Sequence, residues 1–84
     1  MDDKDLENTI RRVTLEIARR KVPQLADVQM EHSLIEWLGL ASMDLAELIA
    51  TLEMELGVDP FATTSISRIR TVGDLYEAYR AAAT

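Results

Sequence analysis

Ser42 is the side chain of this sequence whose type and position most favour chemistry. It stands in the run "GLASMDLAELI", residues 39–49, at the start of an apolar pattern typical of a helix. A serine at a helix start can act as an N-cap, in which its hydroxyl accepts a hydrogen bond from a free backbone N–H. It can also carry an attached phosphate, because the free N–H groups and the helix dipole favour negative charge there. Both roles stay open on this residue alone.

Few other residues in the chain are suited to catalysis or metal binding. His32 is the only histidine, and it has no second histidine at helical spacing with which to hold a metal. Ser42 has no base beside it in the sequence, the three glycines form no phosphate-binding loop, and there is no cysteine. We therefore predict that the protein is not an enzyme and binds no metal, with His32 a satisfied or exposed loop residue. A small hydrolase that pairs Ser42 with a spatially close His32 is the weakest alternative.

The charge of the chain is unevenly distributed. The net charge is −6, and no lysine or arginine occurs between residues 22 and 67. The acidic residues of that window are Asp27, Glu31, Glu36, Asp44, Glu47, Glu53, Glu55 and Asp59. Such a surface repels nucleic acid and attracts a basic protein partner, although a solvated face that maintains solubility would have the same composition.

Apolar spacing predicts helices and no strands, in one domain that spans residues 1–84. The first predicted helix ends before Pro23 and has an apolar stripe made of Leu6, Ile10, Val13 and Ile17. Residues 22–41 form a long connection without a sustained period, which in so small a domain is usually functional or a misread element.

The second half of the chain predicts three further elements. The clearest helix covers residues 43–56 and ends at Gly57, a short helical turn is expected at 63–69, and a last helix starts near Thr71. Thr71 and Asp74 have the spacing of a capping box. The predicted fold is therefore all-α, a small four-helix bundle with three main helices and one short one.

The helix over residues 43–56 has a second ridge opposite its leucine stripe. On a helical wheel this ridge contains Met43, Glu47, Ala50 and Met54, with Asp44 beside it. Two methionines on an acidic ridge suggest an adaptable contact surface for several partners, unless a loop partly covers them.

The residues around Ser42 resemble the acyl carrier protein family. The run "SLIEWLGLASMDLAELIATLEMELGV", residues 33–58, is similar to the family's signature around its modified serine, and "ISRIRTVGDLYEAY" is similar to its final segment. The positions that match the signature are Leu38, Gly39, Ser42, Asp44, Glu47, Leu48, Leu52, Glu53 and Glu55. Helix order, loop lengths and acidity agree with this resemblance over nearly the whole chain.

This resemblance implies a function for Ser42. A phosphopantetheinyl transferase would attach 4′-phosphopantetheine from coenzyme A to its hydroxyl, and the thiol of that arm would carry acyl groups as thioesters. The protein would deliver them to synthases and transferases of fatty-acid, polyketide or related specialised biosynthesis. The implied partner contacts on the helix that follows, which meet Arg- and Lys-rich patches, are Met43, Asp44, Glu47, Ala50, Glu53 and Met54.

Three residues depart from the family pattern. Ala41 replaces the usual aspartate before the serine, which removes one contact for the transferase, and Met43 replaces the usual leucine after it. Trp37 stands where relatives often have a small acid, and it is either a core anchor or an aromatic partner contact beside the arm. Two alternatives remain: an aminoacyl or peptidyl carrier, and an unmodified acidic adaptor in which Ser42 only caps the helix.

The location of the protein is predicted from what the sequence lacks. No stretch approaches the roughly 20 apolar residues of a membrane span, and the acidic N-terminus differs from a signal peptide. We therefore expect a cytoplasmic protein, without membrane insertion and monomeric.

Overall fold

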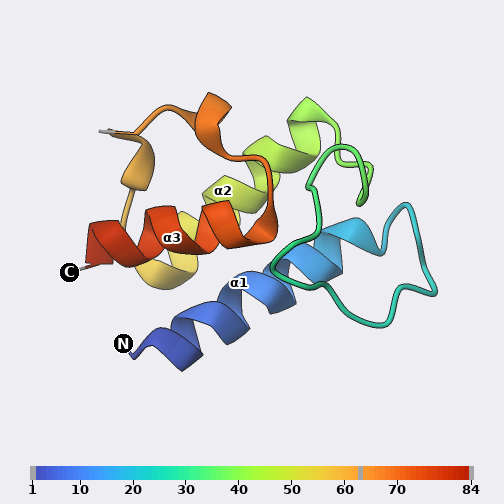
Figure 1. Cartoon of the computed structure of the whole chain (residues 1–84), viewed down its shortest axis with the longest axis horizontal. Coiled ribbons are helices and arrows are strands. Elements are labelled where there is room, and N and C mark those ends of the chain that lie inside the picture. The colour runs from blue at the N-terminus through green and yellow to red at the C-terminus, as the bar shows by residue number, and fades with distance from the viewer. Residues whose placement is uncertain (1, 63, 84) are drawn as a thin grey trace.

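The computed structural model describes residues 2–62 and 64–83 and contains three α-helices in that part of the chain. They are α1 (Asp3–Ala18), α2 (Ser42–Leu56) and α3 (Val72–Ala83), as Figure 1 shows. No strand occurs among the described residues, where Ser33 and Thr71 form an isolated bridge. The prediction of a small all-helical domain is thus confirmed.

The ends of the helices follow from local sequence. Asp2 is the N-cap of α1, and its carboxylate accepts a hydrogen bond from the Asp5 N–H at 2.8 Å. Gly57 ends α2 with a φ of 72°, a left-handed conformation that favours glycine. Thr71 and Asp74 form the predicted capping box, with two reciprocal hydrogen bonds of 3.1 Å at the start of α3.

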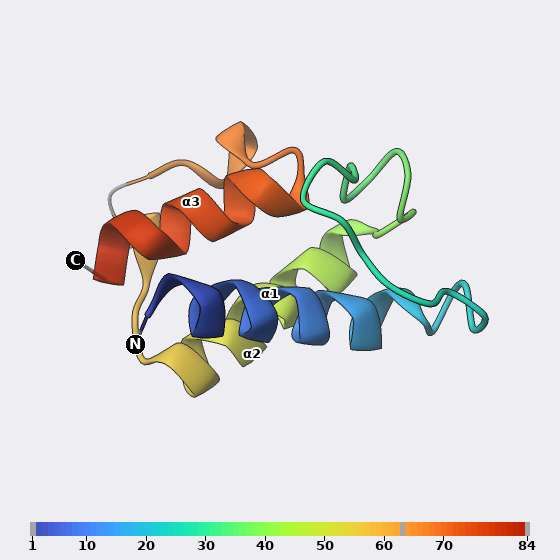
Figure 2. The same ribbon diagram turned by 60° about the horizontal axis from the view of Figure 1, so that its bottom comes forward.

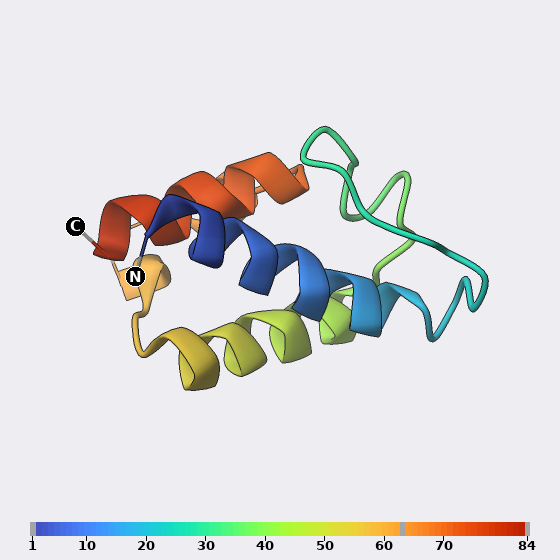
Figure 3. The same ribbon diagram turned by 90° about the horizontal axis from the view of Figure 1, so that it is seen from below.

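The three helices pack around one core. Both α2 and α3 run antiparallel to α1 and begin at the end of the molecule where α1 stops (Figures 2 and 3). The predicted apolar stripe of α1 is buried and meets the inner sides of the other two helices. The buried apolar residues are Leu6, Ile10, Val13, Ile17, Ala18, Val28, Leu34, Leu38, Leu40, Leu48, Leu52, Val72, Leu75 and Tyr79.

The predicted fourth, short helix is where the structure departs from the expected bundle. Its expected start, residue 63, lies outside the described residues. Its later part contains a single 3₁₀ turn, Ile66–Arg68, and another 3₁₀ turn, Pro60–Ala62, precedes it. Ser65 caps the second turn by accepting a hydrogen bond from the Ser67 N–H, which satisfies the backbone locally without a longer helix.

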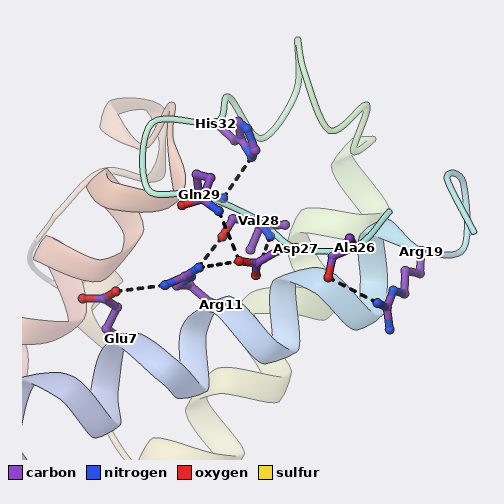
Figure 4. A network of polar contacts seen from close by, with 8 residues as sticks. All are labelled: Glu7, Arg11, Arg19, Ala26, Asp27, Val28, Gln29 and His32. Carbon is purple, nitrogen blue, oxygen red and sulfur yellow. Dashed lines mark hydrogen bonds and ion pairs between the residues drawn. The ribbon is translucent and has the colours of Figure 1, made fainter. Parts of the chain in front are cut away.

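The long connection between α1 and α2 is attached to α1 and to the start of α3. The Arg11 side chain of α1 binds the Val28 carbonyl with Nε at 2.9 Å and the Asp27 carboxylate at 2.7 Å, and Figure 4 shows this network. Further along, backbone N–H groups of Leu34, Val72 and Gly73 donate hydrogen bonds between the connection and the start of α3. The segment without a sustained apolar period is therefore held against α1 and the start of α3 by hydrogen bonds.

Thr14 is the one residue of the described core whose polar group lacks a partner. Its side chain is fully buried in α1, and no hydrogen bond reaches its Oγ1 from the described residues. An unpaired buried hydroxyl costs free energy, and valine has almost the same shape. We expect Thr14→Val to raise the free energy of unfolding by about 1–2 kcal/mol in urea denaturation. Thr9→Val, a half-buried site on the same helix, should change it by less than about 0.5 kcal/mol. Loss of stability in Thr14→Val would show that the hydroxyl has a partner.

Within residues 2–62 and 64–83, no helix combines the length and the apolarity that crossing a membrane requires.

Candidate functional site

Ser42 is the first residue of α2, so of the two roles left open for it, that of the N-cap is wrong. The N-cap position belongs to Ala41, whose methyl group accepts no hydrogen bond. The first turn is instead stabilised from inside, because the Asp44 carboxylate accepts a hydrogen bond from the Ala41 N–H at 2.8 Å. The Ser42 side chain is exposed and its hydroxyl makes no hydrogen bond with any described residue. The hydroxyl is therefore free for chemistry.

The Lys21 side chain contacts one residue on each side of Ser42. Its Nζ donates a hydrogen bond to the Gly39 carbonyl at 2.9 Å and lies 3.0 Å from the Asp44 carboxylate. The Ala41 N–H and, second, this ammonium group hold the pKa of Asp44 below its usual range. Gly39 has a φ of 73°, and this left-handed turn directs the chain into α2. Ser42 is thus presented on a short, fixed corner.

Ser42 lines an open groove of about 770 Å³. Three segments far apart in sequence form it: the connection near Ser33, the first turns of α2, and the approach to α3 from Ile66 to Thr71. They gather at the end of the molecule where α2 and α3 begin (Figure 1). The groove is lined by Ser33, Ile35, Glu36, Ser42, Leu45, Ala46, Ile66, Ser67, Ile69, Arg70 and Thr71. Its volume lies in the range of roughly 300–1,000 Å³ that is typical of ligand pockets.

The acidic face of α2 is paired with one arginine within α1 and with two basic residues that follow this helix. Arg20 forms a two-pronged ion pair with Glu47, one prong of 2.7 Å, and Arg12 contacts Glu55 at 2.6 Å. With Lys21 on Asp44, three carboxylates of α2 already have cationic partners within the chain. The Arg20 guanidinium holds the pKa of Glu47 below its usual range. The basic-free window of the sequence is therefore less acidic in space than its composition indicates.

The apolar part of the predicted ridge is uncovered. Met43 is 85% exposed and Met54 is 86% exposed, so the alternative that a loop covers them is wrong. Ala50 is exposed between them. The Glu53 carboxylate lies close to that of Asp59. Its pKa is raised mainly by partial desolvation and, second, by its interaction with Asp59.

Trp37 is an exposed aromatic, and its interpretation as a core anchor is wrong. The indole is 55% exposed and stacks on His32, with the ring centroids 3.7 Å apart. His32 Nδ1 in turn accepts a hydrogen bond from the Gln29 N–H at 2.9 Å (Figure 4). His32 is thus a satisfied loop histidine, as expected, and it is not among the residues that line the groove at Ser42.

The described residues contain no group of three or more histidine, cysteine, aspartate or glutamate side chains placed to hold a metal ion.

Sequence reasoning missed several residues of the site. Ile35, Ile66 and Ile69 give the groove its apolar walls, and Lys21 fixes the corner at Ser42. One signal was available in the sequence, because Ile35 is a large apolar residue in a segment without a helical stripe. In the structure both Ile35 and Ile66 are exposed.

No protein-family model matches the chain, and no solved structure matches it.

Proposed function

We propose that this protein is a carrier that holds acyl groups as thioesters on a 4′-phosphopantetheine arm attached to Ser42. The observation that carries the proposal is the exposed Ser42 hydroxyl, which makes no hydrogen bond with a described residue and lines a groove with apolar walls. A structural N-cap would have used this hydroxyl within the helix, whereas a modified serine must leave it accessible.

The residues around Ser42 are compatible with the phosphate of such an arm. Helix geometry leaves the N–H groups of Ser42, Met43 and Asp44 without partners inside α2, and their dipoles favour an anion. The Lys21 ammonium adds a positive charge at the same corner. The Asp44 carboxylate would repel the phosphate, but this charge is already offset by Lys21 and by the Ala41 N–H. When bound, the arm would supply the thiol that forms the thioester, since the chain itself has no cysteine.

The partners of such a carrier would include a phosphopantetheinyl transferase and acyl synthases or transferases. Expected contacts are the exposed ridge of Met43, Ala50 and Met54, together with Trp37. Glu47 would exchange Arg20 for an arginine of the partner, so that a basic patch gains little net charge attraction. Docking would then depend more on the methionines than the sequence suggested.

An aminoacyl or peptidyl cargo is the second candidate within carriers. Carriers of that kind tend to be less acidic on the helix after the serine, so the acidic residues of α2 count against this cargo. This objection is weaker in the structure, because three carboxylates of α2 are already paired with cations of α1 and of the residues that follow it.

The test is the intact mass of the protein after incubation with coenzyme A and a broad-specificity phosphopantetheinyl transferase. We expect a gain of one phosphopantetheine per chain, and complete loss of that gain in Ser42→Ala. Ser67→Ala is the matched control, because Ser67 also lines the groove and is exposed, and it should be modified normally.

Two outcomes would count against the proposal. A gain that persists in Ser42→Ala would place the modification elsewhere. No gain, either in the natural chain or in Ala41→Asp, which restores the family's aspartate before the serine, would favour the adaptor.

A further inference from the structure

Arg70 differs from most of the described arginines because its guanidinium makes no hydrogen bond or ion pair with a described residue. The guanidinium groups of Arg11, Arg12, Arg19, Arg20 and Arg80 each bind a carboxylate or a carbonyl. Arg70 makes one hydrogen bond to a described side chain, from its backbone N–H to Asp74, and none from its guanidinium. It lines the same groove as Ser42 and lies two residues before α3. The groove therefore combines apolar walls with one cation that has no carboxylate partner among the described residues.

We propose that the groove accepts an acyl chain tethered at Ser42 whose far end is a carboxylate, and that Arg70 binds this carboxylate. The inference rests on the proposed function and specifies the class of its cargo. Methylene groups would contact Ile35, Leu45 and Ile69 along the walls. The planar guanidinium matches a carboxylate with two parallel hydrogen bonds. A neutral acyl chain would fill the same walls and leave Arg70 unpaired.

The other charged groups near the groove also direct an anionic end group toward Arg70. Glu36 is the second charged residue of the lining, and it belongs to a different segment, the connection before α2. Its carboxylate repels an anionic end group away from that wall. Asp74 lies close to the Arg70 backbone, but its Oδ2 already accepts hydrogen bonds from the Arg70 and Thr71 N–H groups, at 3.0 and 3.1 Å. An anionic cargo end is thus directed to the Arg70 side chain.

The test uses Ser42→Cys, in a chain that otherwise has no cysteine. This variant is alkylated with linear iodoacetamide chains of increasing length that end in a ¹³C-labelled carboxylate. The carboxyl pKa is measured by NMR titration and compared with the same chains on glutathione. We expect the protein-bound carboxyl pKa to be lower by a few tenths to about one pH unit, with a maximum at one chain length.

Matched variants identify the source of the effect. Arg70→Gln should raise the carboxyl pKa to the glutathione value or above it, because Glu36 remains, and Glu36→Gln should lower it below the value of the parent. Arg68→Gln should leave it unchanged, because Arg68 is exposed, has no side-chain partner among the described residues and does not line the groove. An equal pKa in the parent and in Arg70→Gln, or an effect that disappears in Arg68→Gln, would overturn the proposal.

The alkylation result is independent of the transferase reaction. Failure of phosphopantetheine transfer would overturn the proposed function and leave the pKa comparison intact. Normal transfer together with an unshifted carboxyl pKa would overturn only the role of Arg70.

Discussion

Tyr79→Ala is expected to lower the free energy of unfolding by about 3–5 kcal/mol and to leave little folded protein at 37 °C. Tyr79 is completely buried in α3, so alanine would leave a cavity in the core. Its ring also contacts the edge of Phe61, with centroids 6.2 Å apart, and its hydroxyl donates to the Ile49 carbonyl at 3.4 Å. One side chain thus connects α3, α2 and the 3₁₀ turn Pro60–Ala62. Urea denaturation followed by far-UV circular dichroism measures the loss.

Tyr79→Phe is the control for this substitution. It keeps the ring and removes a long hydrogen bond, so the expected loss at neutral pH is below about 1 kcal/mol. Burial, followed by Glu53 and Asp59, raises the pKa of Tyr79. A tyrosine whose pKa is raised by folding stabilises the fold below about pH 10, and this stability is lost as the pH rises further. Tyr79→Phe should therefore lose less stability above pH 10 than the parent, and equal losses in Ala and Phe variants would contradict the cavity argument.

Arg11→Met is expected to lower the free energy of unfolding by about 2–3 kcal/mol. Methionine keeps an apolar stem but removes the charge-assisted hydrogen bonds to the Val28 carbonyl and to Asp27. Val28 is buried, so its carbonyl would lose a partner in a place that water reaches poorly. Urea denaturation measures the loss, and amide hydrogen exchange should increase from residue 28 to residue 34.

Arg12→Met, one residue further on the same helix, is the matched control. Arg12 binds Glu55 and Glu16 at the surface, and exposed ion pairs contribute only about 0–1 kcal/mol. If both variants lose the same free energy of unfolding, the hydrogen bonds of Arg11 to the connection are not what stabilises the fold.

The helices could be predicted from the sequence because their signals are local. The stripe of α1, the stop at Gly57 and the capping box at Thr71 each depend on residues within four positions. The start of α2 was displaced by one residue, because sequence preference favours serine over alanine as an N-cap. In the structure Asp44, the third residue of α2, caps the first turn by accepting a hydrogen bond from the Ala41 N–H. Residue preferences at the N-cap position alone do not predict this contact.

The site could be predicted only in part because most of it depends on packing. The exposure of Met43 and Met54 could be predicted, since the exposed face of a helix follows from its periodicity. Arg20 and Glu47 are 27 positions apart in the chain. Their pairing therefore depends on how α1 and the residues after it lie against α2. The groove likewise joins three segments that no single period links. The exposure of Trp37 was ambiguous because an aromatic residue in a connection can pack in either direction.

The ion pair between Arg80 and Asp3 has a consequence for chain connectivity. Arg80 Nε lies 3.3 Å from the Asp3 carboxylate, and the first turn of α1 lies beside the last turn of α3 (Figure 1). The two ends of the described chain are therefore close enough for a short glycine-rich linker to join them. A circular permutant opened between the exposed residues Pro23 and Gln24 would keep every helix and the groove intact. In such a protein, α2 would become the first helix and α1 the last, with Ser42 in the same surroundings.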